Sequence, residues 1–284
     1  MSTVTLMLSS RRFVTATVAI GALVAACTSN STQSSTHTGA GAPVKVALGA
    51  QPTGTATLTW DPQSKNVTAK VSLSGVTPDS THAIHIHKGG CATMGDVLVP
   101  FPDLRADGGG AINTTVTSTQ PDPGGLASGT SLNMHLASGA QLGGPGAFGF
   151  TPIACGDVVP GTPATVHMAP VGQQPQGSAN MTYDSGKKTL TVTTTASGLA
   201  PGSSHAQHIH LGSCAAQGAV KFGLDDLAAS PTGTAETTTV VQNAEAPPAS
   251  GWYLNVHLGS SSQIQQNGQP TLYFQPIICG NIGK

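Results

Sequence analysis

Charged residues are few in this chain. Of its 284 residues only 8% are Asp, Glu, Lys or Arg, and the formal net charge at pH 7 is −1. Nucleic-acid binding requires a basic surface that neutralises phosphate groups, so this composition excludes DNA and RNA as partners. Helical periodicity is also missing, because no stretch repeats its apolar residues every 3.6 positions. Past the first 26 residues the chain has no apolar run long enough to span a bilayer.

The start of the chain has the features of an export signal. Arg11 and Arg12 precede an apolar stretch over residues 13–24, which is too short to cross a bilayer comfortably. Residues 24–27, Val-Ala-Ala-Cys, resemble the processing site of a bacterial lipoprotein, in which the cysteine becomes the lipid-modified first residue. We therefore expect a signal peptide over residues 1–26, lipidation of Cys27 and an extracytoplasmic protein anchored to the membrane. The alternative is an ordinary secretory signal, and the route, Sec or twin-arginine, stays open.

Residues 27–43 consist mainly of Ser, Thr, Gly and Ala. Such a segment buries too little apolar surface to offset its ordering entropy, so we expect a flexible tether.

The remaining residues form two similar halves. Landmark residues of the first half recur 123 positions later, as with Gly75 and Gly198. A period this long indicates two copies of one domain, which we place at residues 44–159 and 164–284. The joining segment is short, so we expect the two domains to pack together.

Within each copy, apolar and polar residues alternate with period two, as in residues 67–73 and 189–193. Gly, Pro, Asp and Asn gather between these runs. This spacing predicts an all-β protein with two tandem Greek-key β-barrel or sandwich domains.

Histidine pairs occupy the same place in both copies. Residues 82–91 read His-Ala-Ile-His-Ile-His-Lys-Gly-Gly-Cys, and residues 205–214 read His-Ala-Gln-His-Ile-His-Leu-Gly-Ser-Cys. Side chains alternate along a strand, so histidines two positions apart share a face and can bind one metal ion. A solvated pair on an exposed strand is the alternative. The duplication favours metal binding by the two pairs His85 and His87, and His208 and His210.

Each copy also contains one pair of cysteines, separated by 64 and by 65 residues: Cys91 and Cys155, and Cys214 and Cys279. In an exported protein this arrangement indicates one disulfide per copy. Metal ligation by the thiols is the alternative, although the chain lacks a Cys-x-x-Cys spacing.

These motifs together resemble copper/zinc superoxide dismutase. The motifs that carry the resemblance are residues 75–91 and 153–156 in the first copy, and residues 198–214 and 277–280 in the second. The resemblance spans almost the whole of each repeat, including residues 103–104 and 226–227. It implies one copper ion per domain, ligated by His85, His87 and His135 and by His208, His210 and His257. It also implies the disulfides Cys91–Cys155 and Cys214–Cys279. His82 and His205 would orient the sites from behind, and Asn133 and Asn255 would hydrogen-bond near the third ligand. A weaker resemblance relates residues 54–59 to the opening of chordin-type β-domains.

Two departures from the dismutase pattern limit what it implies. No histidine lies between His87 and His135 or between His210 and His257, the interval that supplies the zinc ligands of that family. Zinc is therefore not expected. Pro152 and Pro276 stand where the family has the arginine that attracts superoxide.

We therefore predict an exported, lipid-anchored, dismutase-like copper protein with weak activity toward superoxide. Two alternatives remain: a protein that buffers or sequesters copper without catalysis, and a structural or adhesive β-domain protein with vestigial histidines.

Overall fold

The structure, a computed structural model, describes residues 41–161, 163–172 and 174–283. Cys27, the signal peptide and most of the tether lie outside the described residues. Strands predominate in the described part, where the helices are short 3-10 turns: η1 (Gly139–Gln141), η2 (Phe148–Phe150) and η3 (Leu272–Phe274). The prediction of an all-β protein with two tandem domains is confirmed. No helix among the described residues is long and apolar enough to cross a membrane.

The first domain contains two four-stranded antiparallel sheets, ordered β10-β9-β5-β6 and β11-β2-β3-β8. A bridge between Cys155 and Ala169 connects them. A separate short pair is formed by β4 (Thr81–His82) and β7 (Leu104–Arg105). The main strands are β2 (Thr53–Trp60), β3 (Val67–Ser74), β5 (Ile84–Lys88), β6 (Val97–Pro100), β8 (Ala111–Thr117), β9 (Thr130–His135), β10 (Pro152–Asp157) and β11 (Ala164–Met168).

The second domain contains one eight-stranded sheet in the order β15-β14-β17-β20-β1-β12-β13-β16. A short hairpin is formed by β18 (Gln265–Gln266) and β19 (Gln269–Pro270). The strands of the sheet are β1 (Val44–Ala50), β12 (Gln176–Asp184), β13 (Thr189–Ser197), β14 (Ser204–Ser213), β15 (Ala216–Ala228), β16 (Ala235–Val241), β17 (Trp252–His257) and β20 (Pro276–Ile282).

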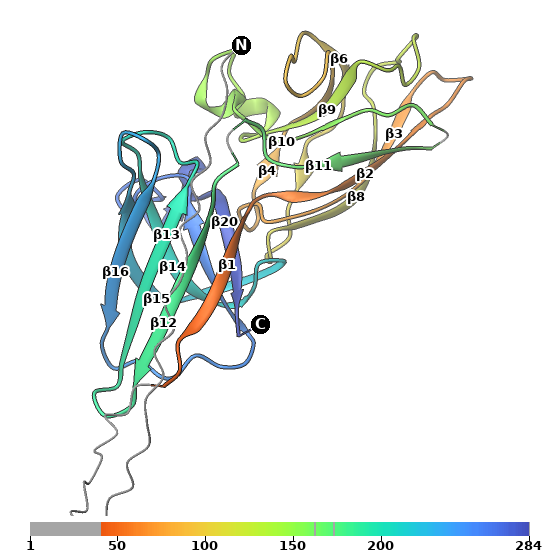
Figure 1. The fold of residues 1–284 in the computed structure, drawn as a ribbon. Coiled ribbons are helices and arrows are strands. Elements are labelled where there is room, and N and C mark those ends of the chain that lie inside the picture. Colours follow the sequence, from red (N-terminus) through yellow and green to blue (C-terminus); the bar gives the residue numbers. More distant parts are fainter. Residues whose placement is uncertain (1–40, 162, 173, 284) are drawn as a thin grey trace, which may run out of the picture. The chain divides into compact units, whose positions relative to one another are not determined.

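The first strand of each repeat lies in the sheet of the other repeat. β1 precedes β2 along the chain, yet it pairs with β12 and β20 of the second domain. β11 precedes β12, yet it pairs with β2, and the residue that follows it bridges to β10. The two strands therefore occupy equivalent places in exchanged sheets, and Figure 1 shows β1 beside β12 and β11 beside β2. The boundaries 44–159 and 164–284 stay a prediction about the sequence repeat, which the sheets do not follow strand by strand.

Alternation along the strands produces the two cores. In β3 the side chains of Val67, Ala69, Val71 and Leu73 are buried, and the residues between them are partly or fully exposed. β13 alternates in the same way, with Leu190 and Val192 inside. Each domain buries its own apolar cluster, and the first cluster includes residues from both of its sheets. Burial of this apolar surface is the main force that stabilises each domain.

Candidate metal centres

The histidine pair of the first domain points away from the apolar core. Along β5, Ile84 and Ile86 belong to the core cluster, so His85 and His87 project from the opposite face of the sheet. The neighbouring strand β9 continues this face, because His85 pairs with Asn133 in the ladder and His135 lies two residues further along. Two adjacent strands thus bring the three histidines together on one face.

The second domain repeats this arrangement on β14 and β17. Ile209 is in the core, and His208 and His210 flank it on the opposite face. His208 pairs with Asn255, and His257 follows two residues later on the same face. The sequence predicted all six histidines as ligands, and the structure brings them together as two groups of three.

Each triad is compact enough for a single ion. The ring nitrogens of His85, His87 and His135 that could ligate lie within 4.8 Å of one another, and those of His208, His210 and His257 do the same. In the first triad the ring centroids are 5.8, 5.3 and 5.7 Å apart. Three imidazoles that converge in this way can hold a transition-metal ion and leave further coordination positions open.

Backbone carbonyl groups fix the second and third histidine of each triad. His87 Nδ1 lies 2.9 Å from the Gly95 carbonyl oxygen, and His135 Nδ1 lies 2.8 Å from that of Phe150. The same contacts join His210 to Gly218 at 2.9 Å and His257 to Phe274 at 2.6 Å. A carbonyl oxygen can only accept, so each Nδ1 carries the hydrogen and each Nε2 keeps its lone pair. This is the tautomer in which a histidine can ligate a metal through Nε2.

Gly218 shows why glycine supplies one of these carbonyl groups. A Cβ atom at this position would lie 2.4 Å from the Leu211 carbonyl oxygen, so a larger residue would displace this part of β15. Only glycine allows β15 to approach β14 closely enough here for the Gly218 carbonyl group to reach His210. Gly95 recurs at the same place in the first copy, a displacement of 123 residues.

Several ring nitrogens at the centres are buried and unpaired. Among the described residues, His85 Nδ1, His87 Nε2 and His210 Nε2 have no hydrogen-bond partner. A buried polar atom without a partner costs about 1–3 kcal/mol. Burial also lowers the pKa of His85 and of His208 to about 4, and the pKa of His257 to about 3. These three rings are therefore neutral at pH 7, the state that binds metal ions.

His82 and His205 support the third ligand through its backbone. His82 Nδ1 is 2.9 Å from the His135 carbonyl oxygen, and His205 Nδ1 is 2.9 Å from that of His257. Both residues are buried. Their contact is with the main chain of a triad histidine and not with its ring.

The two asparagines differ from each other. Asn133 Nδ2 lies 3.3 Å from His135 Nε2, whereas neither polar side-chain atom of the buried Asn255 has a partner among the described residues. In the second triad His208 Nδ1 takes that place, 3.1 Å from His257 Nε2. A metal ion at either triad would replace one of these weak contacts to Nε2.

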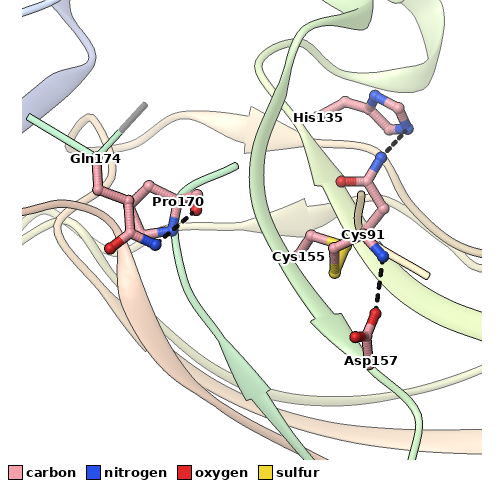
Figure 2. The surroundings of a disulfide bond; sticks show 7 residues. Cys91, His135, Cys155, Asp157, Pro170 and Gln174 are labelled. Carbon is pink, nitrogen blue, oxygen red and sulfur yellow. Dashed lines mark hydrogen bonds between the residues drawn. A yellow bond between two sulfur atoms is a disulfide. The ribbon is translucent and has the colours of Figure 1, made fainter. Parts of the chain in front are cut away.

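Both disulfides are present: Cys91–Cys155 and Cys214–Cys279. Cys155 pairs with Asn133 in the ladder, so the first disulfide adjoins the triad face. Figure 2 shows it between His135 and Asp157, whose carboxylate accepts the Cys91 backbone N–H at 2.7 Å. In the second domain the Asn281 side-chain oxygen accepts the corresponding N–H of Cys214 at 2.9 Å. Thiol ligation, the alternative for these cysteines, does not occur in this arrangement.

Sequence reasoning missed three aromatic residues at the centres. The rings of Phe150 and Phe274 lie 4.6 Å from His135 and 4.4 Å from His257, respectively. Tyr253 stacks on His210 at 5.0 Å, and its buried hydroxyl has no hydrogen-bond partner among the described residues. Phe150 and Phe274 are separated by the same number of residues as Cys155 and Cys279, so the repeat could have revealed them. Ser131 replaces Tyr253 in the first copy, so the repeat conceals the tyrosine.

A comparison with protein families decides the relationship of the chain. The CHRD domain model matches it twice, over residues 25–144 and 158–263. The chain belongs to the CHRD-domain family. No curated protein matches the sequence. Of the two resemblances seen in the sequence, the weaker one to chordin-type β-domains agrees with this assignment.

The dismutase interpretation is therefore wrong. The CHRD domain is a different β-sandwich domain, and the match covers both copies, so the dismutase-like fold type, superoxide chemistry and copper handling as the function all lose their basis. The resemblance misled because its motif is short. A His-x-His strand followed by Gly and Cys describes one strand and its disulfide and does not identify the family of the whole domain. The expectation that zinc is excluded rested on the same resemblance.

Proposed function

We propose that this CHRD protein binds transition-metal ions, one on each histidine triad, outside the cytoplasm. The observation that carries the proposal is the convergence of three histidines in each domain, with buried, unpaired ring nitrogens at His85, His87 and His210. Carbonyl groups hold four of the six rings in the tautomer whose Nε2 carries the lone pair, which is the support that metal-ligating histidines normally have.

The ligand atoms follow from the hydrogen bonds. His87 and His135 have Nδ1 engaged and present Nε2, while His85 has an unpaired buried Nδ1. An ion held by these three atoms would join β5 to β9, and one on the second triad would join β14 to β17. Binding should therefore stabilise each domain in addition to filling its site.

Imidazole nitrogen is a borderline donor that accepts copper, zinc, nickel and cobalt. Affinity for the divalent ions of the first row depends on the ion, so the ions are compared in separate titrations. The proposal concerns occupancy of the sites and assigns no redox reaction to them.

Metal analysis of the mature protein tests the proposal. After removal of metal and titration with Cu(II), Zn(II), Ni(II) and Co(II) in separate samples, we expect two ions per chain for at least one metal. His87→Ala should retain one ion, and the His87→Ala, His210→Ala double variant should retain none. His167→Ala, which removes an exposed histidine on β11, is the control and should retain two. Absence of binding by the unaltered protein, or two ions in the double variant, would contradict the proposal.

We also propose that the protein is lipid-anchored through Cys27, because the small residues before it fit lipoprotein processing. Cys27→Ser should leave the precursor uncleaved or release the protein from the membrane. Unchanged membrane fractionation of this variant, with the signal peptide still removed, would exclude the anchor.

A further inference from the structure

We propose that the first repeat forms part of the second metal centre. Residues 75–77 of the first repeat position, through Gln217 and Gln275, the two carbonyl groups that orient His210 and His257. This inference rests on the proposed function, because it describes how one of the two metal sites is held in shape.

The first connection runs through Gln217. Its side-chain Nε2 donates to the Val76 carbonyl oxygen at 2.8 Å, and its backbone N–H donates to that of Gly109 at 2.9 Å. The next residue is Gly218, whose carbonyl oxygen accepts from His210 Nδ1. The residue before the orienting carbonyl is thus held at two points by the first repeat.

The second connection runs through Gln275, which is 1% exposed. Its Nε2 donates to the Gly75 carbonyl oxygen at 3.0 Å, and its Oε1 accepts the Thr77 backbone N–H at 3.3 Å. The preceding residue is Phe274, whose carbonyl oxygen accepts from His257 Nδ1. Both amide groups therefore lie directly beside a group that sets the orientation of a proposed ligand.

The first triad is built differently at the matching positions. Met94 stands where the second copy has Gln217, and a thioether has no N–H to donate. Thr151 stands where the second copy has Gln275, and it is exposed. The two triads therefore share their histidines but not this support from across the repeats.

Packing at Gly110 ties this support to the first repeat. A Cβ atom there would lie 2.3 Å from Gln217 Nε2 and 2.4 Å from the Val76 carbonyl oxygen. Glycine leaves the space that the Gln217 amide fills. A side chain at this position in the first repeat should disturb a metal centre in the second.

The test measures each centre separately in the full chain. His210→Ala leaves only the first centre, and His87→Ala leaves only the second. In each background we would introduce Gln217→Met, which installs the residue of the first copy, and in separate proteins Gln275→Met and Gly110→Ala. Met94→Leu is the matched control at the first centre. The readouts are the Co(II) affinity and the Co(II) visible absorption spectrum.

With only the second centre present, Gln217→Met, Gln275→Met and Gly110→Ala should each weaken Co(II) binding at least tenfold and shift the spectrum, since loss of supporting contacts typically costs 10–100-fold. With only the first centre present they should change the affinity less than twofold. Met94→Leu should leave the second centre unchanged.

Loss of general stability alone would lower the melting temperature without shifting the Co(II) spectrum, so the spectrum separates positioning from folding. If the second centre binds Co(II) with unchanged affinity and spectrum in all three variants, the inference is overturned while the proposed function stands. If the unaltered protein binds no metal at either centre, the proposed function fails and the inference fails with it.

Discussion

His82 donates its Nδ1 hydrogen to the backbone carbonyl oxygen of His135 at 2.9 Å, and both residues are buried. His82 lies on the short strand β4, which pairs with β7 and not with the sheet that carries the triad. A residue outside that sheet therefore fixes the end of β9, where the third proposed ligand lies.

Replacing this histidine should weaken the first centre. His82→Phe keeps an aromatic ring but removes the donor, so the His135 carbonyl oxygen loses that hydrogen bond and β9 can shift. We expect about tenfold weaker metal binding at the first centre and about 1–3 kcal/mol lower stability. Metal titration in the His210→Ala background measures the effect. His205→Phe in the same background is the control, and an equal loss in both variants would contradict a local role for His82.

The disulfides should contribute strongly to stability, because each closes a long loop within one domain. Removing one by a paired substitution, such as Cys91→Ser with Cys155→Ser, should lower the free energy of unfolding by about 2–5 kcal/mol. Urea unfolding without reductant measures this change. Peptide mapping under non-reducing conditions should recover Cys91 with Cys155 and Cys214 with Cys279, and a Cys91–Cys214 peptide would show that the pairing is wrong.

Acid should destabilise the metal-free protein over a defined interval. Burial lowers the pKa of His85 and His208 to about 4 from an ordinary value of 6.5, so the unfolded chain binds more protons than the folded one between these values. The stability that these two histidines contribute is therefore fully present above pH 6.5 and is lost as the pH falls toward 4. Each such histidine contributes at most about 1.4 kcal/mol per pH unit, and less for these two partly exposed rings.

Urea unfolding in the presence of a chelator between pH 7.5 and 4.5 measures this dependence. The His85→Asn, His208→Asn double variant replaces the two groups with a side chain that does not titrate in this range, so its stability should fall less steeply. A slope equal to that of the unaltered protein would show that other groups are responsible.

Local pattern predicted the strands and the grouping of the six histidines into two sets of three. Alternation in residues 67–73 corresponds to β3, and the two-residue spacing of His85 and His87 places both on one face. The repeat also indicated the third histidine of each triad. These features depend on residues close in sequence, or on a comparison of one copy with the other.

Contacts between the copies could not be predicted in the same way. A repeat shows what two segments share, so it conceals residues that differ, such as Tyr253 against Ser131 and Gln217 against Met94. The exchange of β1 and β11 is hidden for a similar reason, because either strand fits either sheet by its alternation alone. The family was predicted wrongly for a different reason. The His-x-His, Gly and Cys motif of each copy resembles that of the dismutases, whereas the CHRD match covers both copies.

The exchanged strands give a last prediction, because each should stabilise the core of the repeat to which it does not belong in sequence. Leu48 on β1 packs in the core of the second domain, and Val166 on β11 packs in that of the first. The chain has two tryptophans, and they report on different cores: Trp60 packs against the first and Trp252 lies in the second.

Leu48→Ala should therefore destabilise the second domain by about 2–5 kcal/mol. In a Trp60→Phe background, where Trp252 alone reports, the fluorescence transition should move to lower urea. Hydrogen exchange should speed up in β12 and β20, the neighbours of β1, more than in β2 and β10. Val166→Ala, read through Trp60 in a Trp252→Phe background, should show the reverse pattern. Faster exchange in β2 and β10 after Leu48→Ala would mean that β1 pairs within its own repeat in solution, and the exchange of strands would then be wrong.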